Sequence, residues 1–297
     1  MRHPAKQIPI KAIRISLDDI RRVYDRLKIQ VDAEAERILA KFVKPDDKRE
    51  SDFVAEKADL KSRAFRITVT VGGRDGSSLF GDDTEIFSSP NLPDQIAYVY
   101  MTNVVAFELV ANEKPVNRFS LNLDFSEPPL LDANNFVSGP TPNNSNLQVD
   151  GDNDAWVSAV HEAVDGIIRN RRTGRRLIHK AFAYDFGMFV IALPFAFWLC
   201  SKLSGPIEAW FGSLHSVISA GAYVYTFFVV LFAYRVLFGY TKWAFPTVEI
   251  TNNVDHSSRH RFFLECYYSW ATGQRGLGAD KGRNYPPPCQ RGKSLNP

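Results

Sequence analysis

The sequence predicts an α+β domain followed by an all-α hairpin of two transmembrane helices. Two long apolar runs lie between residues 181 and 240, and apolar residues alternate with polar ones from Phe65. Amphipathic helical patterns stand on both sides of the alternating segment, so the domain combines an amino-terminal helix, an antiparallel strand meander and a closing helix. The expected segments are a basic arm with a charged amphipathic helical segment (1–63), an antiparallel β-rich domain with its closing helix (64–172), the hairpin (173–242), and a juxtamembrane amphipathic helix with a disordered basic tail (243–297).

The amino-terminal segment begins as a basic arm, because residues 1–15 interleave four Lys and Arg residues with short apolar side chains. This stretch lacks the continuous apolar region of a signal peptide, so the first apolar run is expected to act as the insertion signal. Apolar residues then recur at steps of three and four over 17–42, which predicts a helix, and Ser16 with Asp19 forms a variant capping box. The helix either binds a partner or packs on its own domain, and its short pattern favours packing. Residues 46–63 carry dense charges of both signs and predict a linker or a second, exposed helix.

The middle of the chain predicts antiparallel strands joined by short links. A helix closes the domain from caps at 150–154 to about residue 172, and this layout resembles a pleckstrin-homology-like module without any specific motif. Residues 127–146 are rich in proline, glycine and asparagine and predict a loop. The expected strands are 65–71, 85–87, 95–102, 104–111, 118–125 and 147–149.

Two apolar runs, about 181–202 and 215–240, predict a transmembrane helical hairpin. At a rise of about 1.5 Å per residue, each run is long enough for a hydrocarbon core of about 30 Å. The alternative is a pair of buried helices in a soluble protein. Small residues four apart, such as Ala192 and Ala196, would let the two helices approach closely, and Pro194 would kink the first.

A cluster of Lys and Arg before the first run predicts the orientation of the hairpin. Because basic residues near a span stay on the cytoplasmic side, both termini are expected in the cytoplasm of a multi-pass protein of the inner or plasma membrane. The connection between the runs then faces outward. The topology-setting cluster comprises Arg169, Arg171, Arg172, Arg175, Arg176 and Lys180.

Two charges within the runs, Asp185 and Arg235, are expected at similar depth near the cytoplasmic interface. A charge in a transmembrane helix costs roughly 2.5 to 3.5 kcal/mol at the bilayer centre and less near the interface. An ion pair across the hairpin would reduce that cost for both residues. The alternative is that each side chain reaches separately for the headgroups.

A short amphipathic helix is predicted after the second run, with basic residues at its start and aromatics along one side. Such a helix suits the inner leaflet of a membrane, or it packs on the preceding domain. Its aromatic positions are Phe262, Phe263, Tyr267 and Trp270.

No catalytic constellation, cofactor motif or metal-ligand set stands out, and the formal net charge of +3 gives no broad support for nucleic-acid binding. His161 with Asp165, and His256 with His260, share helical spacing but lack further partners. We therefore expect a non-enzymatic interaction or regulatory domain tethered by the hairpin, with membrane lipid and a protein partner or a second copy as its partners. The alternative is a self-associating, pore-forming effector, whose layout resembles small two-span bacterial toxins. The spans lack a polar stripe, which favours the tether.

Overall fold

The computed structural model describes residues 5–128, 141–213 and 216–251. The chain divides into two compact units, Met1–Asn253 and Val254–Pro297, and all of the described residues belong to the first unit. The predicted inner-leaflet helix with Phe262, Phe263, Tyr267 and Trp270 lies outside the described residues, as do His256 and His260.

A six-stranded antiparallel sheet forms the centre of the α+β domain, in the order β1-β7-β6-β5-β3-β4. The predicted antiparallel pairing of the middle strands is confirmed. The sequence predicted no strand before Phe65, yet the arm supplies β1 at the edge beside β7, and β2. The strand bounds are β1 Ala5–Pro9, β2 Ile13–Ile15, β3 Thr68–Gly73, β4 Ser78–Gly81, β5 Ile96–Thr102, β6 Arg118–Asp124, β7 Asn146–Asp150 and β8 Val248–Ile250.

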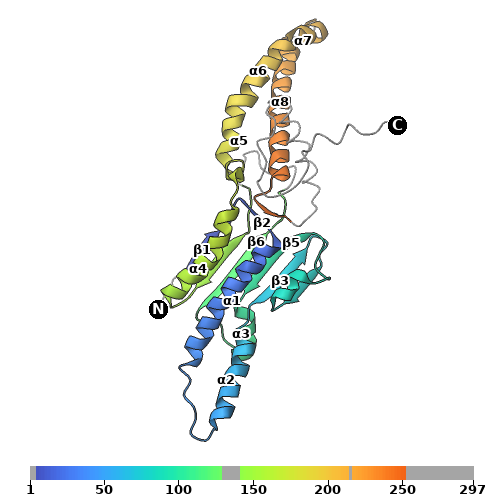
Figure 1. The fold of residues 1–297 in the computed structure, drawn as a ribbon. Coiled ribbons are helices and arrows are strands. Elements are labelled where there is room, and N and C mark those ends of the chain that lie inside the picture. The colour runs from blue at the N-terminus through green and yellow to red at the C-terminus, as the bar shows by residue number, and fades with distance from the viewer. Residues whose placement is uncertain (1–4, 129–140, 214–215, 252–297) are drawn as a thin grey trace, which may run out of the picture. The chain divides into compact units, whose positions relative to one another are not determined.

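Two helices, α1 (Leu17–Leu39) and α4 (Asp154–Ile168), lie over the same face of this sheet (Figure 1). The period-two pattern explains the face they cover, because alternate residues of β6 such as Phe119, Leu121 and Leu123 are buried. The capping box of Ser16 is present at the start of α1, and α1 packs on its own domain as expected. Full burial of each large apolar side chain contributes about 1.5 to 3 kcal/mol, so this layer stabilises the domain.

Residues 46–63 were predicted as a linker or an exposed helix, and α2 (Glu50–Ala64) confirms the helix. The strand predicted at 104–111 is wrong, because Val104–Ala111 forms helix α3. The hydroxyl of Thr102 accepts the N–H of Val104 at 3.2 Å, and Asn112 ends the helix in the left-handed conformation with φ 56°. A short apolar run does not distinguish a strand from a helix by periodicity, so these two ends decided the outcome.

The short strand predicted at 85–87 is also wrong, because Thr84–Ser88 forms the 3-10 helix η1. The side chain of Asp83 accepts the N–H of Glu85 at 2.9 Å and starts this turn. Ile86 and Phe87 are both buried, whereas consecutive residues of a half-buried strand would face opposite sides. Strand β4 (Ser78–Gly81) was not among the expected strands.

The apolar runs form a hairpin of two packed arms, and the connection between them contains α7 (Ser204–Phe211) (Figure 1). Phe182–Lys202 and Ser216–Ala244 are each long and apolar enough to cross a membrane. The first arm holds a π-helical turn just before Pro194, where the proline ring would otherwise crowd the carbonyl group four residues earlier. The first arm comprises α5 Ala181–Gly187, η4 Met188–Ala192 and α6 Leu193–Lys202, and the second arm is α8 Ser216–Ala244.

Candidate functional site at the base of the hairpin

Three distant parts of the sequence meet where the hairpin leaves the α+β domain, and we call this meeting point the hairpin base. Strand β8, which follows the second arm, pairs in parallel with β2, which precedes α1. The N–H of Ile13 donates to the carbonyl of Thr247 at 3.1 Å, and Ile13 also forms an antiparallel bridge with Arg172. The segment before the first arm comprises the 3-10 helices η2 (Arg169–Arg171) and η3 (Gly174–Leu177). Both arms are therefore fastened to the same short strand.

Ala12 carries an unusual backbone conformation at this point. Its φ is 55°, and its side chain is 2% exposed. Its carbonyl accepts the backbone N–H of Thr173 at 2.6 Å and the hydroxyl of the same residue at 3.1 Å. A left-handed conformation costs a non-glycine residue roughly 1 to 2 kcal/mol, so these contacts and the surrounding packing hold Ala12 in place.

Glu249 is the charged centre of the base, and only 6% of its side chain is exposed. Arg175, from the segment before the first arm, donates to its Oε2 at 2.5 Å. Arg14 of β2 approaches its other oxygen at 3.8 Å, and the Arg175 guanidinium lies 5.5 Å from the ring centre of Phe245. A buried carboxylate is tolerated only when it is paired and hydrogen-bonded, so Glu249 depends on cations from two other segments.

Asp19 provides a second buried acid, at the start of α1. Arg171 donates to Oδ1 of this carboxylate at 2.8 Å, and the Ser16 hydroxyl donates to Oδ2 at 2.8 Å. Burial of the carboxyl raises its pKa, but the hydrogen bonds from Arg171 and Ser16 outweigh burial and hold the pKa of Asp19 below its ordinary value of 3.8. The ion pair fixes η2 against the domain.

His179 links the two arms directly and is 7% exposed. Its Nε2 lies 2.7 Å from the carbonyl of Phe245, and its Nδ1 lies 2.9 Å from the hydroxyl of Thr141. A neutral ring that donates from Nε2 and accepts at Nδ1 satisfies both contacts. Burial lowers the pKa of His179 below its ordinary value of 6.5, and the charges of Lys242 and Arg175 lower it further.

The predicted basic cluster separates into two groups in the structure. Arg171, Arg172 and Arg175 pair with Asp19, Asp165 and Glu249 respectively. The remaining three residues have exposed side chains and form no ion pair with any described residue. These are Arg169, Arg176 and Lys180. The role of the cluster in setting membrane topology stays a prediction.

Along the arms, contacts are made by small residues and aromatic rings. A Cβ atom on Gly187 would lie 2.0 Å from the hydroxyl of Tyr234, which donates to the carbonyl of Tyr184 at 3.2 Å. Ala192 and Ala196 are 2% and 0% exposed, in agreement with the expected close approach of the two helices.

Asp185 and Arg235 lie at one level of the hairpin, because their sequence neighbours Tyr184 and Tyr234 are joined by a hydrogen bond of 3.2 Å from the Tyr234 hydroxyl to the Tyr184 carbonyl. Their ion pair stays a prediction.

No group of three or more His, Cys, Asp or Glu side chains in the described part of the chain could hold a metal ion. Asp165, which has helical spacing from His161, accepts a hydrogen bond from Arg172 at 2.9 Å. An open cavity of 190 Å³ lies on the other face of the sheet, where Arg118 pairs with Asp150 at 3.3 Å. Its lining also includes Tyr100, Lys114 and Ser120.

Comparison with protein-family models, curated proteins and solved structures finds no match for this chain. The role of the hairpin base is therefore inferred from its contacts and charges alone. Sequence reasoning missed Glu249, Asp19 and His179 as members of this site. The available signal was a single acid between Val248 and Ile250, since an isolated charge in an apolar strand needs a buried partner.

Proposed function

We propose that the protein is an integral membrane protein whose hairpin holds the α+β domain at the cytoplasmic face of the inner or plasma membrane. The α+β domain acts as an interaction or regulatory module, not as an enzyme. The observation that carries this proposal is the exposure of the apolar arms, since only 22% and 6% of their most apolar 18-residue stretches are buried. Large exposed side chains include Phe182, Phe186, Phe189, Phe197, Trp198, Tyr225, Phe228 and Phe232.

Water is a poor solvent for that surface, because each exposed Å² of apolar area costs roughly 25 cal/mol. A buried helix pair in a soluble protein would cover such side chains, and a monomer rarely exposes a patch this long. Lipid chains cover them at no such cost. The backbone of both arms is helical, which also suits a hydrocarbon environment.

The hairpin base supports a regulatory role for the domain. Both arms are held by side chains that the domain itself positions, through Asp19 on α1 and Glu249 beside β2. A ligand or partner that shifts α1 would therefore move the ends of both arms. We expect a flexible Gly/Ser insertion after Gly174 to remove this coupling and leave the domain folded.

Topology tests the proposal most directly. In a variant lacking Cys200, Cys266 and Cys289, a new cysteine at Gly205 should react with an impermeant maleimide added outside intact cells. A cysteine at Ser51 should react only after permeabilisation. Extraction of the full chain by alkaline carbonate, or labelling of both positions from one side, would contradict the tether.

The alternative pore-forming effector is tested in the same cells. We expect no depolarisation of a voltage-sensitive dye when the full chain is induced, because the arms present no polar stripe among their described residues and pack on each other through Ala192 and Ala196. A chain truncated before Lys180 is the control. Depolarisation by the full chain alone would favour the effector.

A further inference from the structure

We propose that Arg169, Arg176 and Lys180 form a docking surface for anionic lipid headgroups, which we call the headgroup triad. The inference rests on the proposed function, because it needs the hairpin in a bilayer. It assigns different roles to two halves of one basic cluster. Arg171, Arg172 and Arg175 hold the fold, and the headgroup triad holds lipid.

The first step is the distribution of acidic partners. The three fold-holding arginines each lie within 2.9 Å of a carboxylate oxygen. Those carboxylates belong to Asp19, Asp165 and Glu249, which together compensate three positive charges. The cluster of six thus keeps three cations that are compensated by no ion pair with the described residues. A surface with this excess of positive charge complements an anionic one.

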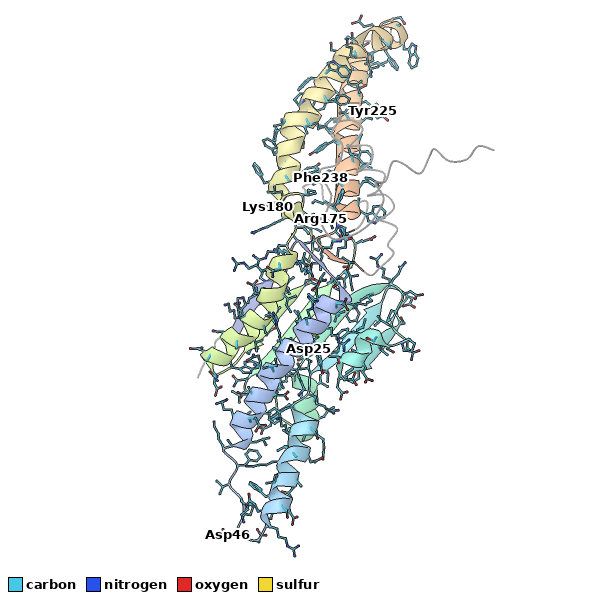
Figure 2. All side chains as sticks on the ribbon, viewed as in Figure 1. Asp25, Asp46, Arg175, Lys180, Tyr225 and Phe238 are labelled. Carbon is cyan, nitrogen blue, oxygen red and sulfur yellow. The ribbon has the colours of Figure 1, made fainter. Side chains whose placement is uncertain are left out.

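The second step is the position of the triad along the chain. Lys180 directly precedes α5, and Arg176 lies within η3. Figure 2 shows Lys180 and Arg175 at the same level, at the lower end of the first arm. Leu177 and Phe182, on either side of that level, are 68% and 71% exposed. Exposed apolar side chains among exposed cations are typical of a segment that lies in the headgroup layer.

The third step is the charge on the neighbouring elements. On the second arm, the cation in the last turn of α8 is Lys242, whose ammonium lies 5.3 Å from the ring centre of Phe238. Asp165, the last acid of α4, already forms an ion pair with Arg172. Each Lys or Arg at an anionic membrane surface increases binding by about fivefold. Three such residues are sufficient to enrich anionic lipid around the base.

Quenching by brominated lipid measures this enrichment. The full chain is reconstituted into phosphatidylcholine vesicles containing a minority of phosphatidylglycerol, with bromine on the acyl chains of one lipid or the other. The chain carries Phe in place of its other four tryptophans, so that Trp243, near the end of α8, is the only reporter. We expect brominated phosphatidylglycerol to quench the fluorescence of Trp243 several times more than its share of the lipid predicts. This excess quenching should shrink at high salt, where charges are screened.

The test variant combines Arg169→Gln, Arg176→Gln and Lys180→Gln. It should lose the excess quenching and keep the melting temperature of the parent chain, because no ion pair with a described residue is lost. The matched control combines Lys41→Gln, Arg49→Gln and Lys114→Gln. These three exposed cations also form no ion pair with a described residue, and they follow α1, precede α2 and follow α3, so their loss should keep the excess.

Two failures have separate meanings. The headgroup triad alone would be overturned if the chain floats with the vesicles and both brominated lipids quench in proportion to their share. It would also be overturned if the test variant keeps the same excess quenching by brominated phosphatidylglycerol as the parent chain. A chain that carbonate strips from the vesicles would overturn the proposed function itself. Loss of the excess in the control would show a general charge effect and would also overturn the triad.

Discussion

The base and the arms of the hairpin are held together by different forces. At the base, buried acids and a buried histidine contact specific partners from three segments. Along the arms, small residues and aromatic rings make close contacts, and Tyr184 lies 5.3 Å from Phe238 between ring centres. Charge and hydrogen bonding act strongly only where protein excludes water and supplies partners. The base therefore fixes the direction in which the arms leave, and the arms determine only how closely they pack.

The largest expected effect is at the base. Glu249→Gln leaves the half-buried Arg175 without its counter-charge, and breaking a buried pair in this way costs about 3 kcal/mol. Urea unfolding of the full chain in detergent micelles measures the loss. Replacing both residues, with Arg175→Met, should recover much of it.

The control for this change is Glu36→Gln, which removes an equally close pair with Lys61 where the acid is 70% exposed. An exposed pair contributes at most about 1 kcal/mol. Equal losses for Glu249 and Glu36 would remove the distinction between the base and an ordinary surface.

A smaller effect is expected in the arms. Gly187→Ala places a methyl group against the Tyr234 hydroxyl, and overpacking of this kind costs about 2 kcal/mol. The thiol of Cys200 reports arm separation, because it faces the carbonyl of Tyr223 at 3.7 Å and should react faster with maleimide when the arms part. Adding Tyr234→Phe should slow the reaction again.

Gly221→Ala is the matched control in the other arm, since its added Cβ would meet no atom within 4 Å. Faster reaction of Cys200 in this variant would mean that glycine acts through helix stability and not through the contact with Tyr234.

Acidification should weaken the base and spare the arms. Because burial lowers the pKa of His179, the unfolded chain binds the proton more readily, so the stability from neutral His179 is complete above pH 6.5 and declines as the pH falls below 6.5. The pKa of Asp19 is also lowered in the folded chain, so its contribution to stability likewise declines as the pH falls, but only below pH 3.8. Hydrogen exchange of β8 amides between these two values measures the opening. His179→Gln, which keeps one donor and one acceptor, should abolish this pH dependence.

The smallest expected effect is a gain at the base. Ala12→Gly removes the strain of the left-handed backbone, which costs alanine roughly 1 to 2 kcal/mol. Glycine also loses more conformational entropy on folding, which offsets up to about 1 kcal/mol of that gain. We expect thermal stability to rise by less than 1 kcal/mol. Destabilisation by Ala12→Gly would show that the methyl group contributes more through packing than its conformation costs.

The layers of the α+β domain could be predicted from sequence because periodicity reports burial directly. The alternation in β6 and the three-four spacing in α1 each identified the buried face. The strand prediction for Val104–Ala111 was wrong because this short, mostly apolar segment fits both the period of a strand and the period of a helix. The helix is instead decided by its two ends, at Thr102 and Asn112. Strands β1 and β8 were missed because each is short and pairs with a segment far away in sequence.

The hairpin base was harder to predict than the fold. Its basic residues were found by their density, but density does not say which of them have acidic partners. Arg171 and Asp19 are far apart in the chain, and only the packing of α4 beside α1 brings them within 2.8 Å. A single sequence holds the local pattern and not that long-range pairing.

The π-helical turn at Met188–Ala192 sets the rotation of the helix that follows it in the first arm. A π turn holds about one residue more than an α turn, so helix beyond it is offset by about 100° relative to an uninterrupted α-helix. If the extra residue moved along the arm, the helix between its old and new positions would turn by that angle while both ends stayed where they are. Phe197, now 5.3 Å from Phe227 between ring centres, would then point elsewhere. Such a shift would change which side chains the arm presents to α8 without changing its number of residues.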